Sequence, residues 1–172
     1  MPTPPLSDKP VRVSYGVYSH GVISGRRVFG GALPSGAGVQ DAEMGAVLVY
    51  LRDVWLQVGT DGTPALVHVL VHCNSVLIDI EWARRAGSLK ALRNRNRRRM
   101  LERIVELCRS PRIQRVVFQW VRGHRGMLPS QYADAMATSH LNDTPVNLHV
   151  LLSQPDSDNN KAVFQQRATL VR

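Results

Sequence analysis

Apolar residues recur at helical spacing between residues 42 and 58, and this is the clearest pattern in the chain. The spacing places them on one face of a 3.6-residue repeat, so the segment is predicted to form an amphipathic helix. The apolar positions are Met44, Val47, Leu48, Leu51, Val54, Trp55 and Val58. Asp41 precedes this segment and is predicted to be the N-cap of the helix.

Residues 11–33, upstream of this helix, have a different pattern. β-Branched and aromatic residues stand between glycines, as in VRVSYGVYS and RRVFGGAL. This pattern is typical of consecutive hairpin strands. Downstream of the helix, LVHVLVH at residues 66–72 is a short apolar run that predicts a buried strand.

Two helices are predicted after that strand. VLIDIEWARRAG at residues 76–87 is the first, and Gly87 is its expected C-cap. An arginine-dense segment then leads into the second, which ends at Ser110-Pro111. One face of that helix is predicted to comprise Leu101, Ile104, Val105 and Cys108.

RVVFQWV at residues 115–121 predicts another strand, and a last helix is expected from about Ser130 to His140. The order is therefore hairpin strands, helix, strand, two helices, strand and helix. This order predicts a mixed α/β fold.

One domain is expected over residues 11–141. Residues 1–10 contain four prolines and are expected to be a flexible arm. The C-terminal extension, residues 142–172, has one strand-like run, VNLHVLL at residues 146–152. From residue 153 onward the sequence is polar, and no structure is predicted there.

The composition suits a globular protein: the chain has 172 residues, of which 44% are hydrophobic. No apolar run reaches the eighteen or so residues of a membrane helix, and the first twenty residues show no secretory pattern. An intracellular protein without a membrane partner is therefore expected, in an unresolved compartment (mitochondrial, nuclear or cytosolic). Cys73 and Cys108 lack metal-type spacing and are expected to be thiols.

Positive charge dominates the chain. Lys plus Arg is 22 against 13 for Asp plus Glu, which gives a net charge of +9 at pH 7. Nearly all of this charge is arginine, because the lysines are only Lys9, Lys90 and Lys161. The guanidinium group suits phosphate oxygens, so the excess favours a nucleic-acid partner, although charge alone leaves the function open.

Two groups of residues have a plain structural interpretation. His68, His72 and Cys73 could suggest zinc, but His72 and Cys73 point to opposite faces of a strand and no second ligand pair follows. Packing is therefore the favoured role. Trp82 and Trp120 are expected to be core or interface aromatics rather than base-stacking platforms.

Three strings, in order along the chain, resemble ribonuclease H between about residues 11 and 141. WVRGHRGMLPSQYADAMA (120–137) is similar to the family's strand end, Gly-His-x-Gly loop and last-helix start. AEMGAVLVYL (42–51) is similar to its first helix, and VHCNSVLIDI (71–80) to a strand-to-helix junction. The resemblance implies an RNase H-like mixed central sheet, with hairpin strands first and flanking helices.

The resemblance also implies a metal site. In this family four acidic residues hold two divalent ions that cut nucleic acid. Glu43 stands at the second acidic place and Asp134 at the fourth, whereas Asn74 stands at the third. The first place falls at Tyr15-Gly16, and residues 9–40 contain no Asp or Glu.

Half of the acidic set is thus missing, which removes most of the field that gathers two cations. No metal or cofactor is expected, with Glu43 and Asp134 as weak metal candidates. Magnesium or manganese would be needed if a substitute acid restored the site. The nearby acids are Asp41, Asp79 and Glu81. His124 resembles the mobile loop histidine that helps the family's product leave.

An arginine cluster occupies five of seven positions: Arg93, Arg95, Arg97, Arg98 and Arg99. Only Glu102 and Glu106 lie nearby at helical spacing, so a polyanion is favoured over a solvated helix face. Some family members carry a basic protrusion in this place that grips the hybrid duplex. Arg122 and Arg125 complete the predicted nucleic-acid surface.

The sequence therefore predicts a catalytically inactive RNase H-like protein that binds RNA or an RNA–DNA hybrid, within a larger ribonucleoprotein. One alternative is an active ribonuclease H with a rearranged metal site, a metal-dependent endoribonuclease acting on hybrids. Another is a protein–protein interaction module that uses a sheet edge, Trp82 or the C-terminal extension. An origin in a retroelement's RNase H domain stays open.

Overall fold

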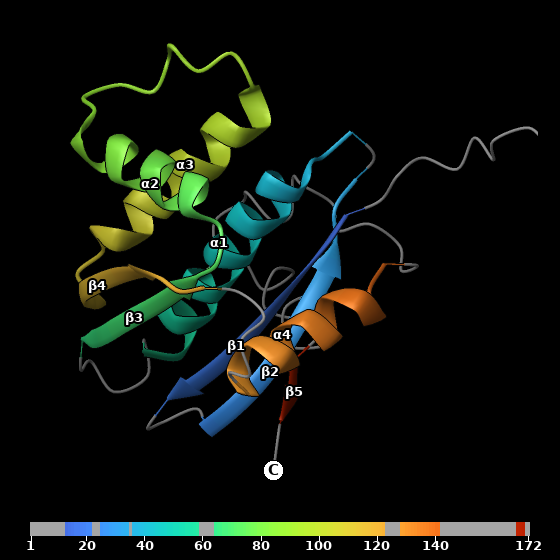
Figure 1. The fold of residues 1–172 in the computed structure, drawn as a ribbon. Coiled ribbons are helices and arrows are strands. Elements are labelled where there is room, and N and C mark those ends of the chain that lie inside the picture. The colour runs from blue at the N-terminus through green and yellow to red at the C-terminus, as the bar shows by residue number, and fades with distance from the viewer. Residues whose placement is uncertain are drawn as a thin grey trace, which may run out of the picture.

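The computed structural model describes residues 13–21, 25–34, 36–58, 64–122, 128–141 and 168–170. The first elements are β1 (Ser14–Gly21), β2 (Gly25–Ala32), α1 (Val39–Val58) and β3 (Ala65–Val71). They are followed by α2 (Asn74–Arg85), α3 (Arg95–Cys108), β4 (Ile113–Trp120), α4 (Leu128–Ser139) and β5 (Ala168–Leu170). The prediction of a mixed α/β fold is confirmed (Figure 1).

The described strands form two sheets. β1 and β2 are antiparallel, with Val17 opposite Phe29, and β5 pairs with the other edge of β2. β3 and β4 are parallel, with Val67 opposite Val116. The single central sheet expected from the sequence is not seen among these strands, because β1 and β3 do not pair and a cavity lies between them.

Helices cover both faces of the β1–β2 sheet and the inner face of the β3–β4 sheet (Figure 1). α1 and α2 contact β3, whose inward residues Val67, Val69 and Val71 are buried, while α2 and α3 contact β4. α2 and α3 also supply the long connection that two parallel strands need. α4 packs against β1 and β2. Neighbouring residues of β1 point to opposite faces, so Tyr15 contacts α1 at Gly45 while the next residue meets α4.

The approach of α4 to β1 is close at Gly16. A Cβ added to Gly16 would overlap the carbonyl oxygen of Ala133 and lie 2.8 Å from the backbone nitrogen of Ala137. Ser14 strengthens the same contact, because its hydroxyl donates to the Ala137 carbonyl at 2.5 Å. The missing side chain at Gly16 therefore allows the helix to lie on the sheet.

α1 is more deeply buried than the predicted amphipathic helix. Met44 and Leu48 are buried as predicted, but so are Arg52 and Asp53. The reason is the position of α1, which contacts β1, β3, α2 and α3. Burial, together with nearby Arg103, lowers the pKa of Arg52 to about 10.

The N-terminus of α1 differs from the prediction. The helix begins at Val39, so Asp41 is its third residue and the N-cap prediction is wrong. The Gly38 backbone N–H donates to the Asp41 carboxylate at 2.8 Å. This is the reciprocal contact of a capping box, in which an acid at the third position reaches back to the start of its helix.

α2 and α3 also begin and end at defined residues. α2 ends at Arg85, followed by Ala86 in an extended conformation, so the prediction of Gly87 as the C-cap is wrong. Asn94 caps α3, because its side-chain oxygen accepts the Arg97 N–H at 3.0 Å. The arginine cluster therefore lies on the loop before α3 and on its first turns.

The predicted apolar face of α3 packs against α1. Leu101, Ile104 and Val105 are buried, and Cys108 is half-buried. Cys73 and Cys108 are both free thiols, as predicted. Burial raises the pKa of the Cys108 thiol to about 11.

Some predictions concern residues outside the described part of the chain, among them the arm at 1–10 and the strand-like run at 146–152. β5 lies in the tail for which no structure was predicted. Three residues carry no periodic signal, and their pairing with β2 is a long-range contact. No described helix combines the length and the apolar character needed to cross a membrane.

Candidate functional site

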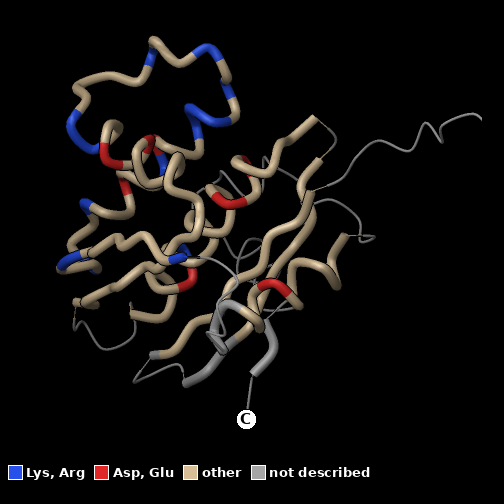
Figure 2. Tube along the Cα trace, viewed as in Figure 1, with Lys and Arg blue, Asp and Glu red and all other residues tan. Residues whose placement is uncertain are grey.

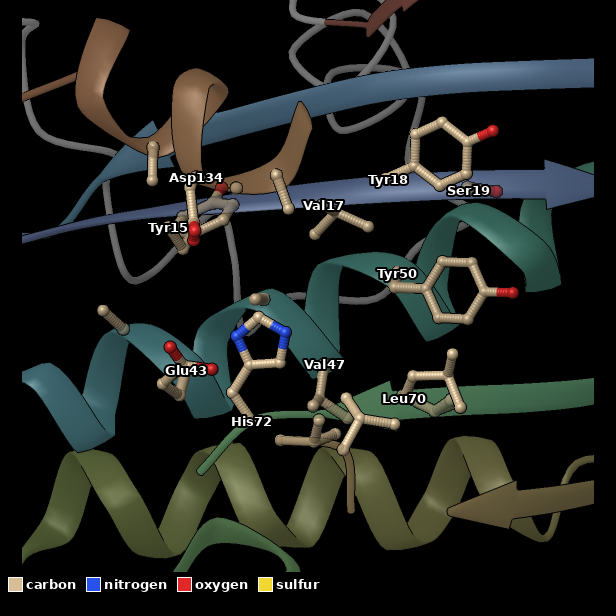
Figure 3. A pocket seen from close by; sticks show the side chains of 18 of the residues that line it. Tyr15, Val17, Tyr18, Ser19, Glu43, Val47, Tyr50, Leu70, His72 and Asp134 are labelled. Carbon is tan, nitrogen blue, oxygen red and sulfur yellow. The ribbon is translucent and has the colours of Figure 1, made fainter. Parts of the chain in front are cut away.

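A cavity of about 310 Å³ lies between β1 and β3 (Figure 3). Consecutive residues line it, residues 14–20 on β1 and 68–72 at the end of β3. Side chains alternate between the two faces of a strand, so lining by consecutive residues means that the strand edges face the cavity. α1 contributes Glu43 and Tyr50, and α4 contributes Asp134.

Glu43 and Asp134, the two acids predicted at family positions, both line this cavity. Figure 3 shows the His72 ring next to Glu43, with Asp134 on the other side of the cavity. Burial raises the pKa of Glu43, while His72 lowers it and Asp134 raises it further. Three ionisable side chains from three parts of the fold therefore interact electrostatically here.

The first and third acidic places are arranged differently. Tyr15 lines the cavity, but it is 5% exposed and belongs to the core, where its ring lies beside Gly45 of α1. Gly16 lines the cavity but offers no donor atom from a side chain. Asn74 opens α2, is exposed, and lies beside a separate hollow with Trp82. Of the four predicted acidic positions, two therefore carry an acid that lines the cavity.

The proposed substitute acids contact other residues. The Asp41 carboxylate accepts the Nε and Nη2 groups of Arg97 at 3.0 Å and 2.9 Å. Asp79 accepts the side-chain amide of Gln40 at 3.0 Å. Glu81 forms ion pairs with two arginines of its own helix at 3.5 Å and 3.6 Å. None of the three is among the residues that line the cavity.

These donors do not fit a two-metal site. Mg²⁺ demands near-octahedral oxygen coordination, and two ions need carboxylates on both. The cavity offers two carboxylates and three imidazoles, from His20, His68 and His72. Within the described ranges, no group of three or more His, Cys, Asp or Glu side chains is arranged to hold a metal ion. His124 and Arg125 lie outside the described residues.

The resemblance to ribonuclease H rests on three short strings and on the order of the elements. Comparison with known family models and with curated proteins gave no match. Of the predicted acidic positions, Glu43 and Asp134 come together and Asn74 stays apart. His72, for which the sequence favoured a packing role, lines the cavity and interacts electrostatically with Glu43. Its signal was its place, directly after a buried strand and two residues before Asn74.

His68, His72 and Cys73 do not converge on one point. His68 is exposed on β3 and shares a hydrogen bond of 2.9 Å with Gln119, so a packing role is wrong for this residue. The Cys73 sulfur contacts the Ser75 hydroxyl at 3.1 Å. Strand alternation explains the difference, because His68 occupies the face of β3 opposite the buried valines.

The two tryptophans were predicted to be core or interface aromatics; both are exposed, so the core alternative is wrong and the interface alternative stays a prediction. Trp82 is 43% exposed on α2, close to the exposed Ile78. Trp120 is 50% exposed at the end of β4, and its indole N–H donates to the His72 carbonyl at 2.9 Å. Apolar spacing alone does not distinguish an inward position from one at the end of an element.

The arginine cluster divides into engaged and open residues. Arg97 is committed to its ion pair with an acid of α1, and its side chain is 26% exposed. Arg98 and Arg99 are half-buried, whereas Arg93 and Arg95 are exposed. Figure 2 shows basic residues gathered along the loop between α2 and α3. The open part of the cluster therefore lies on this loop and the start of α3.

Other exposed basic residues are scattered along the sequence. Arg122, predicted from the motif, is exposed two residues after the end of β4. Those missed by sequence reasoning are Arg85, Lys90, Arg109, Arg112 and Arg115. The density of basic residues along the sequence did not single them out, because isolated basic residues are common on protein surfaces.

Proposed function

We propose that this chain is a catalytically inactive RNase H-like protein that binds RNA or an RNA–DNA hybrid, as a subunit of a larger ribonucleoprotein. The observation that carries the proposal is the make-up of the cavity between β1 and β3. It has two carboxylates, from Glu43 and Asp134, where the family resemblance implies four. The exposed arginines supply the binding half of the proposal.

The loss of turnover follows from charge. Two divalent cations carry four positive charges, and Glu43 and Asp134 supply at most two negative ones. Burial favours the neutral form of Glu43, since it raises the pKa of this carboxyl. His72 adds no negative charge. Cation binding strong enough to activate water is therefore not expected, and cleavage should fall by orders of magnitude.

Binding to a polyanion is supported by the exposed basic loop. Lys90, Arg93 and Arg95 are exposed close together in sequence, on a chain with a net charge of +9. Phosphate contacts of this kind release counterions and dominate the affinity of nucleic-acid complexes. The interface would recognise backbone phosphates, which both RNA and hybrid present.

A cleavage assay tests the first half of the proposal. Purified protein is incubated with a labelled RNA–DNA hybrid and magnesium or manganese, beside an active ribonuclease H as a positive control. We expect no metal-dependent cleavage. Robust cleavage that Glu43→Gln abolishes would contradict the proposal and favour a rearranged active site. Asn74→Asp alone is not expected to restore cleavage, because residue 74 lies outside the cavity.

A binding assay over a range of salt tests the second half. If about four basic residues neutralise phosphates, log affinity should fall against log salt with a slope of about −3 to −4. Arg95→Glu should weaken binding and make the slope shallower. Arg109→Glu is the matched control, with the same change of charge about 20 Å away beyond the other end of α3. A flat salt response, or equal losses in both variants, would refute the assignment.

A second candidate function, docking of a protein partner, is favoured by the exposed apolar side chains of Ile78 and Trp82 on α2. The two functions respond to different substitutions. Trp82→Ala should leave hybrid affinity unchanged if phosphates are the ligand. Association with a protein partner that survives Arg95→Glu but not Trp82→Ala would support docking instead.

A further inference from the structure

Among the described strands, β4 has one unpaired edge. It is the outer strand of the β3–β4 sheet, and no described strand pairs with its second side. The strand is eight residues long. An unpaired edge of this length presents a row of backbone N–H and C=O groups that another chain can extend.

Proteins usually protect such an edge with charges, proline or a bulge. In β4 the charge and the bulge both lie in the first three residues. Ile113 pairs with Ala65 and Arg115 with Leu66, so Gln114 is an extra residue that breaks the register. Residues 116–120 contain neither a charge nor a proline. The second half of the edge is therefore open to pairing.

Exposed apolar side chains accompany this open half. Val117 is 40% exposed on the outer face, and Trp120 is 50% exposed at the strand end. The neighbouring strand adds Leu66 and Leu70 on the same outer face. Parallel sheets are usually covered on both faces, so an uncovered outer face at an open edge is unusual.

We propose that this chain forms a homodimer in which β4 pairs antiparallel with β4 of a second copy, about a two-fold axis at Val117. A two-fold axis perpendicular to the sheet keeps the outer side chains of both copies on the same face. Each residue must therefore pair with a residue whose side chain points to the same face of the sheet. With the axis at Val117, Val116 faces the partner's Phe118. Arg115 faces the partner's Gln119.

The sequence of β4 is self-complementary in this register. Apolar residues face apolar ones, and the Arg115 guanidinium can donate to the side-chain carbonyl of the partner's Gln119. No pair of like charges is brought together across residues 115–119. An axis at Val116 or at Phe118 would place Arg115 opposite a valine. The register centred on Val117 is therefore the one that satisfies the strand's single charge, and an identical copy supplies the complement.

The dimer should be weak and dependent on concentration. One pair of strands is a small contact beside the roughly 1,600 Å² of a standard interface. It extends the β3–β4 sheet to four strands across the axis and leaves the loop between α2 and α3 uninvolved. Its formation does not depend on the proposed nucleic-acid binding.

Sedimentation equilibrium of the full chain over a wide concentration range, without nucleic acid, tests the proposal. Val117→Lys places two ammonium groups at the axis and should raise the dissociation constant more than about tenfold. Leu66→Lys is the matched control on the same outer face, away from the edge, and should leave association unchanged. A dimer that Val117→Lys leaves intact would overturn the proposal, because its interface would lie elsewhere.

Cross-linking provides a second measurement, because it traps the dimer covalently even when only a small fraction of the chain is associated. Opposed residues of antiparallel strands have Cα atoms about 4.5–5.5 Å apart, which a disulfide can bridge. Under mild oxidation, Val117→Cys should form a covalent dimer several times faster than Leu66→Cys. The wild-type chain, with Cys73 and Cys108, gives the background. Equal rates for the two variants, or a chain that stays monomeric, would overturn the proposal.

Discussion

Gly16→Ala tests the packing of α4 on β1, which positions Asp134 over the cavity. The added methyl group would overlap the Ala133 carbonyl oxygen and lie 2.8 Å from the backbone nitrogen of Ala137. These are backbone atoms of a helix, so no side-chain rotation can relieve the overlap and α4 must move. Overpacking typically costs about 1–3 kcal/mol, and we expect about 3 kcal/mol here because backbone has to shift.

Thermal and urea unfolding measure this cost. A loss of about 3 kcal/mol lowers the folding constant about a hundredfold and the melting temperature by about 6–12 °C in a chain of this size. Gly87→Ala is the matched control, because a Cβ at Gly87 meets no atom within 4 Å. It should change stability by less than about 0.5 kcal/mol. Equal melting temperatures for the two variants would refute the close packing, and with it the placement of Asp134 near Glu43.

Three further predictions concern charged and thiol groups. Glu43→Gln should stabilise the fold near neutral pH, because burial raises the pKa of Glu43 above 4.5 and ionising this carboxyl therefore costs folding free energy. This cost grows as pH rises from 4.5 through the folded pKa and should vanish below pH 4.5. Unfolding of the wild type and the variant across this pH range measures it. Asp41→Asn should cost about 1–3 kcal/mol in urea unfolding, because Asp41 contacts Arg97 and the start of its helix. Glu102→Gln is the control and should cost under about 1 kcal/mol, since its ion pair with Arg98 is 4.0 Å long. Equal costs for the two variants would contradict this prediction. Burial raises the pKa of Cys108 to about 11, so alkylation near pH 8 should be at least about tenfold slower in the folded than in the denatured chain, measured in a variant lacking the other thiol.

The helices and strands with a clear apolar pattern in the sequence were predicted close to their observed positions. The apolar repeat located α1 to within three residues of its start, and the alternation of β3 was read one residue late at each end. The burial of Arg52 and Asp53 could not be predicted from that repeat, because it depends on packing from several sides of α1. Likewise, the separation of β1 from β3 arises from contacts between distant segments.

The candidate site was predictable where a motif placed its residues. Glu43 and Asp134 were identified from strings of residue types, and both line the cavity. The sequence favoured a packing role for His72, because its neighbours in space, which place it beside Glu43, cannot be read from the chain. Asn74 matched the motif in sequence, yet it opens α2 outside the cavity. Spacing along a chain fixes the order of residues but not the direction of a side chain at a strand-to-helix junction.

A dense cluster of charges in sequence is not the same as a charged surface in space. Arg97 meets Asp41 from 56 residues away, so the most specific contact of the cluster is structural and removes one cation from any binding surface. Arg93 and Arg95 stay open, and two residues cannot account for a salt slope of about −3 to −4. The loop between α2 and α3 adds only the exposed Lys90, which brings the number of open cations to three. If such a slope is measured, the binding surface must therefore extend beyond the loop, to the exposed Arg85 at the end of α2 or to the half-buried Arg98 and Arg99 on α3.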